Sequence, residues 1–248
     1  MSNRSAALVL ATAVALIATG AGRAVAEGSS AHSGGCNPPP PPVVPSASDF
    51  VDHVDNRYFP LTPGTIYLYQ GHEGSTPSQD RVAVTNETKT ILGVRTTVVQ
   101  DDVELGGQPS EKTSDWYAQD RQGNVWYFGE DAFAYVDGHW IRSDDSWESG
   151  VDGAQPGIIM ETHPKVGDVY AQEFYPGHAR DVAKVLRTND TVTVPYGTFH
   201  HVLTTVECTP LEPGVIDLKH NAKRVGDISE MTVKGGSEAL ELVSVTHG

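Results

Sequence analysis

Short runs of alternating apolar and polar residues, separated by turn residues, extend along most of the chain. Examples are TIYLYQ from Thr65, TTVVQ from Thr96, NVWYFG from Asn124 and EALELVSV from Glu238. A period of two residues is typical of strands, and the β-branched and aromatic content favours the same structure. Long stretches with a helical period are missing, and only the segment 177–186 could form a helix or a strand. The pattern predicts an all-β fold.

The pattern also repeats within the chain at a fixed offset of 103 residues. TNETKTI at Thr85 corresponds to TNDTVTV at Thr188, and RQGNV at Arg121 corresponds to RVGDI at Arg224. A fixed period of this kind is the usual sign of a repeated supersecondary unit. We therefore predict two similar antiparallel β-meander units, packed as a sandwich or a curved half-barrel with a cleft at their junction. The units comprise residues 61–131 and 164–234.

The N-terminal 48 residues differ in composition from the rest of the chain. Residues 1–26 combine Arg4, an apolar run and the sequence AVA, which is the pattern of a secretory signal peptide. Residues 27–48 are rich in Gly and Ser and then in Pro, as in a disordered or polyproline II linker. Residues 49–248 suit a single β domain. We expect a secreted or otherwise extracytoplasmic protein without membrane insertion, because no apolar run is long enough to span a bilayer.

The net charge excludes one class of partner, and the cysteine content predicts one disulfide bond. The chain has 32 acidic and 17 basic residues, a formal net charge of −15, which argues against nucleic acid as a partner. Cys36 and Cys208 would both enter a compartment that permits disulfides, so a bridge from the N-terminal arm to the second unit is expected. Lipid modification of Cys36 is the alternative. Two cysteines alone cannot form a thiolate zinc site.

Aromatic residues are concentrated in two neighbouring predicted strands, SDWYAQ and NVWYFG. Alternation places Trp116, Trp126 and Phe128 on one face and Tyr117 and Tyr127 on the other. A two-layer β fold has only one core, so one of these faces should be exposed. We expect the tryptophans to lie in the core and the tyrosines to line a wet outer face.

In the predicted strand TIYLYQ, aliphatic side chains and tyrosines also lie on opposite faces. Ile66 and Leu68 alternate with Tyr67 and Tyr69, and we assign the aliphatic pair to the core. Tyrosines with apolar bodies and polar tips suit a surface that binds an amphipathic molecule or a sugar. The alternative is that tyrosine simply favours strands. The predicted ligand-binding residues are Tyr67, Tyr69, Asp115, Tyr117 and Tyr127.

Histidines and acids offer a second, catalytic interpretation. His200 and His201 are adjacent in a predicted strand, so they should point to opposite faces, one outward and one inward, and do not readily share a metal ion. Glu173, His178 and Asp181 surround a turn and include the minimum groups for general acid–base catalysis. No metalloprotease, nucleophile-elbow, phosphate-loop or dinucleotide motif occurs, and no cofactor is predicted. For an enzyme, the candidate catalytic residues are Glu173, His178, His201 and His220.

A further acidic group lies in the connection between the two units, residues 137–166. Its oxygen ligands could hold calcium, but the spacing follows no known calcium-binding loop, so a solvated loop is the preferred interpretation. The residues are Asp144, Asp145, Glu148 and Asp152.

The segments DWYAQDRQGNVWYFGE, VPYGTF and AKRVGDI resemble secreted bacterial all-β proteins of unknown function. The resemblance covers residues 59–233 and implies no activity. In those proteins the last motif is more often Tyr-Ala-x-Gly-Val-Gly, and this chain departs from it around Lys219 and His220.

Three functions are compatible with these patterns. The leading prediction is a secreted, non-catalytic module that binds a small amphipathic ligand, glycan or envelope component on the tyrosine-lined face. The runner-up is a secreted hydrolase or lyase that uses carboxylate and histidine groups in the cleft between the two repeats. A structural or adhesive surface protein displayed on the proline-rich linker is the third, although the sequence shows no anchor for it.

Overall fold

The computed structural model describes residues 36–248, so the predicted signal peptide and most of the linker lie outside the described residues. In the described part the chain forms eighteen strands and one short 3-10 helix, η1 (Ala47–Asp49), which confirms the all-β prediction. None of residues 36–248 forms a helix long and apolar enough to cross a membrane. The first ten strands are β1 (Phe50–Val51), β2 (Val54–Asn56), β3 (Phe59–Leu61), β4 (Thr65–Glu73), β5 (Thr76–Ile91), β6 (Val94–Leu105), β7 (Gln108–Asp120), β8 (Val125–Val136), β9 (His139–Arg142) and β10 (Trp147–Glu148). The others are β11 (Gln155–Met160), β12 (Val169–Ala171), β13 (Glu173–Phe174), β14 (Val182–Val194), β15 (Gly197–Cys208), β16 (Ile216–Ala222), β17 (Gly226–Lys234) and β18 (Glu238–His247).

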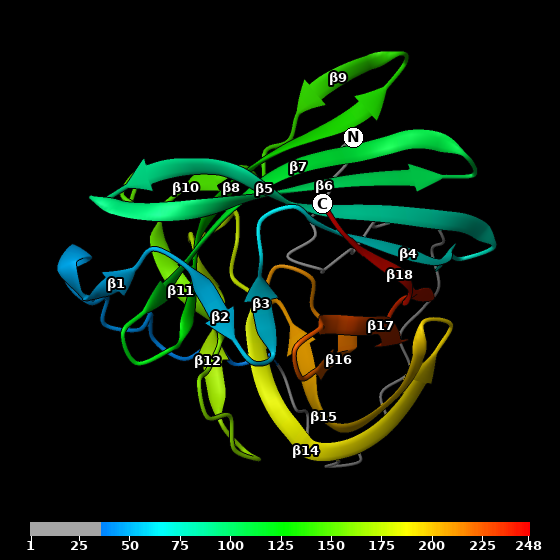
Figure 1. The fold of residues 1–248 in the computed structure, drawn as a ribbon. Helices are drawn as coiled ribbons and strands as arrows, with labels where there is room; N and C mark the ends of the chain where they lie inside the picture. Colours follow the sequence, from blue (N-terminus) through cyan, green and yellow to red (C-terminus); the bar gives the residue numbers. More distant parts are fainter. Residues whose placement is uncertain (1–35) are drawn as a thin grey trace, which may run out of the picture.

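Sixteen of these strands form one antiparallel sheet that curves back on itself. The main order is β12-β14-β15-β16-β17-β18-β4-β5-β6-β7-β8-β11-β13, and β1, β9 and β10 attach at β7 and β8. In Figure 1, β4 to β8 lie above and β14 to β17 below, with the β2–β3 hairpin between them. The sheet therefore encloses an interior, as expected for a strongly curved half-barrel.

The two ends of this strand order are consecutive in the chain. β12 pairs with β14 and β13 pairs with β11, and only Gln172 separates β12 from β13. The backbone N–H of Gln172 donates to the carbonyl of Asp181 at 2.8 Å. Gly157 of β11 lies directly beneath this junction, since a Cβ there would be 2.3 Å from the carbonyl carbon of Gln172. Gln172 thus connects the two ends of the curved sheet, and it passes over a glycine, which has no side chain to obstruct it.

Tight hairpins explain the regular up-and-down order of β4 to β8. Leu92 and Gly93 have φ values of 51° and 79° between β5 and β6, and Gly106 and Gly107 have 59° and 75° between β6 and β7. Two successive positive φ values match the twist of the flanking strands in two-residue hairpins. The turn positions therefore fix the register in which inward-facing side chains meet.

The two predicted repeat units have the same strand order. β4-β5-β6-β7-β8 corresponds to β12-β14-β15-β16-β17, except that the counterpart of β4 is interrupted before β13. β6 and β15 both begin and end 103 residues apart. The segment that could have been a helix or a strand, 177–186, is a turn followed by the start of β14. The origin of the two units from one duplicated sequence stays a prediction.

The core lies on both sides of β7 and β8, so the tryptophans are buried as predicted, whereas the prediction that the tyrosines are exposed is wrong. Tyr117 and Tyr127 belong to the main core inside the curved sheet, whereas Trp116 and Trp126 belong to a second, smaller core outside it. Phe50 packs edge-on against Trp126 with ring centroids 6.1 Å apart, and so helps the N-terminal arm to cover the tryptophan face. The N-terminal arm, which lies outside the two repeat units, thus buries the tryptophan face of β7 and β8.

The same correction applies to β4. Tyr67 and Tyr69 are 7% and 3% exposed in the main core, whereas Leu68 is 41% exposed. Ile66 is only partly buried. The tyrosines therefore face the interior of the curved sheet, and the expected wet outer face is absent at these described positions.

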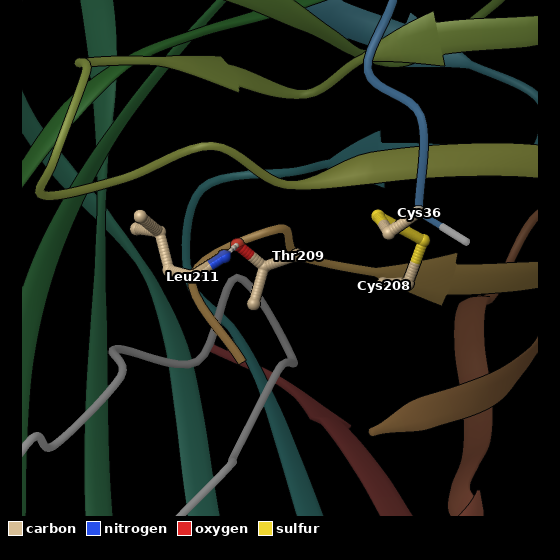
Figure 2. The surroundings of a disulfide bond; sticks show 4 residues. All are labelled: Cys36, Cys208, Thr209 and Leu211. Carbon is tan, nitrogen blue, oxygen red and sulfur yellow. Dashed lines mark hydrogen bonds between the residues drawn. A yellow bond between two sulfur atoms is a disulfide. The ribbon is translucent and has the colours of Figure 1, made fainter. Parts of the chain in front are cut away.

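A disulfide bond joins Cys36 to Cys208, as expected. Figure 2 shows Cys208 at the end of β15 and Cys36 on the extended N-terminal arm that passes beside it. The bond links positions 172 residues apart in sequence. It leaves Cys36 no free thiol for lipid modification and fixes the start of the described arm to the second unit.

Candidate functional site

The interior of the curved sheet contains a cavity lined mainly by aromatic and aliphatic side chains. The cavity itself has a volume of about 40 Å³, and the larger space of about 450 Å³ around it includes open solvent. Four of the five residues predicted to bind a ligand line it, although from the opposite side of the sheet to the one expected. The lining residues are Phe59, Pro60, Leu61, Tyr67, Tyr69, Val82, Val99, Asp115, Tyr117, Val225, Gly226 and Asp227.

The alternation of neighbouring strands brings the predicted residues together. Tyr67 and Tyr69 come from β4, Asp115 and Tyr117 from β7, and each pair is two residues apart, so both members face inward. Tyr127 of β8 is directly opposite Tyr117, and their rings stack with centroids 4.8 Å apart. Tyr127, the fifth predicted residue, thus does not line the cavity itself but packs against Tyr117, which does.

The Tyr127 hydroxyl lies between two buried carboxyl groups. It is 2.6 Å from Oδ1 of Asp115 and 2.7 Å from Oε2 of Glu130. A phenol has one proton to donate, so it donates to one carboxylate and accepts from the other, which must be protonated. In agreement, burial raises the pKa of Asp115 to about 8 and raises the pKa of Glu130 well above its ordinary value. The site therefore holds at least one carboxylic acid near neutral pH.

Three more acidic residues share this inner face, and the sequence analysis did not identify them. Asp80 of β5 and Asp101 of β6 are 1% and 2% exposed, and Glu111 of β7 is 6% exposed. Burial raises the pKa of Asp80 to about 6 and that of Glu111 to about 8. Burial, and then the negative charge of Asp80, raises the pKa of Asp101 well above its ordinary value. The first unit therefore has a strongly acidic interior.

The interior of the second unit is also acidic but contains a lysine. Nζ of Lys219 on β16 is 3.0 Å from Oε2 of Glu207 on β15 and 3.9 Å from Oε2 of Glu230 on β17. Burial opposes the charge of Lys219, but the two carboxylates keep its pKa above the ordinary value. The amine of Lys219 thus balances one of these two negative charges.

The β2–β3 hairpin covers one end of the cavity. Phe59 packs edge-on against Tyr117 with ring centroids 5.2 Å apart, and the Tyr67 hydroxyl donates to the carbonyl of Pro60 at 3.4 Å. The base of the hairpin is firmly attached: the Asn56 amide donates to the carbonyls of Gly123 and Glu161 at 2.8 and 3.2 Å. The hairpin therefore forms part of the cavity wall.

The candidate catalytic residues have separate surroundings. Glu173 is buried in the interior, where burial and the negative charges of Asp181 and Asp115 raise its pKa. His178 lies outside, stacked on Tyr175 with its ring 3.3 Å from the carbonyl oxygen of Asp144. Thus Glu173 and His178 do not form a pair in the described residues.

The other histidines are bound to polar neighbours. Nδ1 of His220 is 2.9 Å from the Ser229 hydroxyl, and burial lowers the pKa of the histidine. His201 contacts the Asn189 side chain and is exposed, with a φ of 57°. His200 is exposed as well, so the prediction of one inward and one outward histidine is wrong. The positive φ and the irregular β14–β15 register break the alternation on which that prediction rested.

The acidic group between the two units is not a metal site in the structure. Glu148 forms an ion pair with Lys89 at 2.8 Å. Within residues 36–248, no three His, Cys, Asp or Glu side chains are arranged so that they could hold a metal ion.

Comparisons with known proteins give similar structures without an activity. No family model matches the chain, and no curated protein matches it. A candidate exported protein with a YmcC-like fold from Bacteroides fragilis is 12% identical with a TM-score of 0.46, and the match covers 77% of this chain and 99% of that one. A candidate lipoprotein from Parabacteroides distasonis is 13% identical with a TM-score of 0.42 and the same coverage.

Proposed function

We propose that the protein is an extracytoplasmic, non-catalytic module that binds a small amphipathic molecule inside its curved sheet. The observation that supports this most is that Tyr67, Tyr69, Asp115 and Tyr117 line one cavity. Apolar walls with a few convergent polar groups are characteristic of small-molecule sites. The rings of Tyr67, Tyr69 and Tyr117 would contact the apolar part of the ligand, and Asp115 its polar part.

Filling the cavity tests this function. Val82 lines the cavity and is only partly buried, so Val82→Phe adds volume there with limited strain. We expect the uncharged amphipathic dye N-phenyl-1-naphthylamine to become fluorescent with the native protein in a saturable manner, and its affinity to fall about ten-fold or more in Val82→Phe. The measurement is a fluorescence titration.

The control places the same ring on the surface. Val233 is a strand residue that is 50% exposed and does not line the cavity, so Val233→Phe should bind the dye as the native protein does. If the dye does not bind the native protein, or binds Val82→Phe with unchanged affinity, the interior is not a ligand site.

A further inference from the structure

The buried acids of the first unit lack the cation that the second unit provides. In the second unit Lys219 contacts Glu207 and Glu230. In the first unit, the charged groups that act most strongly on Asp80, Asp101, Glu111, Asp115 and Glu130 are all acidic. Among residues 36–248, the sheet therefore supplies one amine to the buried carboxyls of the second unit and none to those of the first.

Asp80 and Asp101 show this deficit most directly. All four of their carboxyl oxygens are buried, and none accepts a hydrogen bond from another described residue, apart from a proton that the two groups can share. Buried polar groups without partners are uncommon and are often satisfied by an ion or ligand. An unpaired buried carboxylate is costly, whereas an ammonium group can donate three hydrogen bonds to such oxygens.

These acids lie next to the cavity. Tyr69, which lines it, is directly opposite Asp80 across the β4–β5 pair. Val82 and Val99, which also line it, flank Asp101: Val82 is its cross-strand partner, and Val99 is two residues before it on the same face. Asp115 lines the cavity itself. Of the three carboxyls, Asp115 faces the cavity directly, and Asp80 and Asp101 lie on the same inner face beside residues that line it. Tyrosine rings would favour a positive charge there from the side.

We propose that the ligand of this cavity is an amphipathic primary amine, with its ammonium group held by Asp80, Asp101 and Asp115 and its apolar part against Tyr67, Tyr69 and Tyr117. This proposal rests on the proposed function and specifies its ligand. Binding of the ammonium ion displaces protons from the acids, so amine binding releases protons and the binding of a neutral analogue does not.

The test compares three probes with the same eight-carbon chain: octylamine, octan-1-ol and octanoate. At pH 7.5 we expect the native protein to bind octylamine at least about ten-fold more tightly than octan-1-ol, and octanoate most weakly. Calorimetry in two buffers of different ionisation enthalpy should show release of about one proton per octylamine bound and none for octan-1-ol.

Matched variants locate the effect. Asp80→Asn with Asp101→Asn removes the charges and keeps the shape, so octylamine should lose its ten-fold advantage and its proton release, while octan-1-ol binds as before. Glu104→Gln is the control, because Glu104 is also an acid of β6 but exposed; it should behave as the native protein does.

The outcomes separate the two proposals. If octan-1-ol binds and octylamine has no advantage, the preference for an amine is wrong and the ligand site remains. An octylamine advantage that persists in the double variant also overturns the amine proposal. If none of the three probes binds and the naphthylamine dye does not bind either, the proposed function itself fails.

Discussion

Buried acids such as Asp101, Glu111 and Asp115 make the stability of this protein depend on pH. A carboxyl group whose pKa is raised by folding binds protons more tightly in the folded state, so its contribution to stability is fully present below the unfolded-state pKa of about 4 and is lost as the pH rises through the folded-state pKa. For Glu111 and Asp115, with folded-state pKa values of about 8, this loss extends from about pH 4 to pH 8. The native protein should be more stable at pH 5 than at pH 8.

Replacing Asp101 by Asn should reduce this dependence. The amide cannot ionise, so we expect Asp101→Asn to raise the free energy of unfolding at pH 8 by on the order of 1–3 kcal/mol and to change it little at pH 5. Denaturant unfolding at the two pH values measures this. Glu104→Gln should leave the pH dependence unchanged, because Glu104 is an exposed acid on the same strand. Equal destabilisation of both variants at pH 8 would contradict the expectation.

The sequence carries a signal for these buried acids in the alternation of β6. In VVQDDVEL, Asp101 occupies the same alternating position as Val99 and Val103, which are both buried. An acid at an apolar position of a strand indicates a buried carboxyl. The tyrosines and Asp115 were correctly grouped because period-two alternation holds in β4 and β7.

At the scale of the strands, the sequence predicted where β structure occurs but not which face is buried. Runs of alternating residues became strands because local alternation is a property of each strand alone. The faces of β7 and β8 depend on Phe50 and the rest of the N-terminal arm, which cover Trp126 from outside. That contact joins residues far apart in sequence, so no local pattern could reveal it, and the assumption of a single core wrongly placed the buried tyrosines on an exposed face.

The β12–β13 junction gives a prediction about one glycine. An alanine at Gly157 would place its Cβ 2.3 Å from backbone atoms of Gln172, which cannot move aside as a flexible side chain would. We expect Gly157→Ala to destabilise the protein by about 1–3 kcal/mol, as in other cases of overpacking. Gly197 is the matched control, because it is also in a strand and nothing lies within 4 Å of a Cβ built there. Thermal unfolding of the two variants compares them, and equal melting temperatures would show that the junction is not tightly packed.

For the whole molecule, the disulfide should contribute substantially to stability. It closes a loop over a sequence separation of 172 residues, and a long loop restricts the unfolded chain most, which predicts a contribution of about 3–5 kcal/mol. We expect a reductant to lower the melting temperature of the native protein and to have no effect on a variant with both Cys36→Ser and Cys208→Ser. Detection of two free thiols in the untreated native protein would refute the bond.

The junction at Gln172 also affects how copies of this protein meet one another. Exposed edge strands offer unpaired backbone groups to a second molecule, which is a common route to aggregation by strand addition. Here β12 and β13, the two ends of the main strand order, adjoin each other in the chain and are both paired. Each is paired on one side and is only 3 or 2 residues long, so it offers a second copy few backbone groups, and self-assembly through these strands should be disfavoured even at high protein concentration.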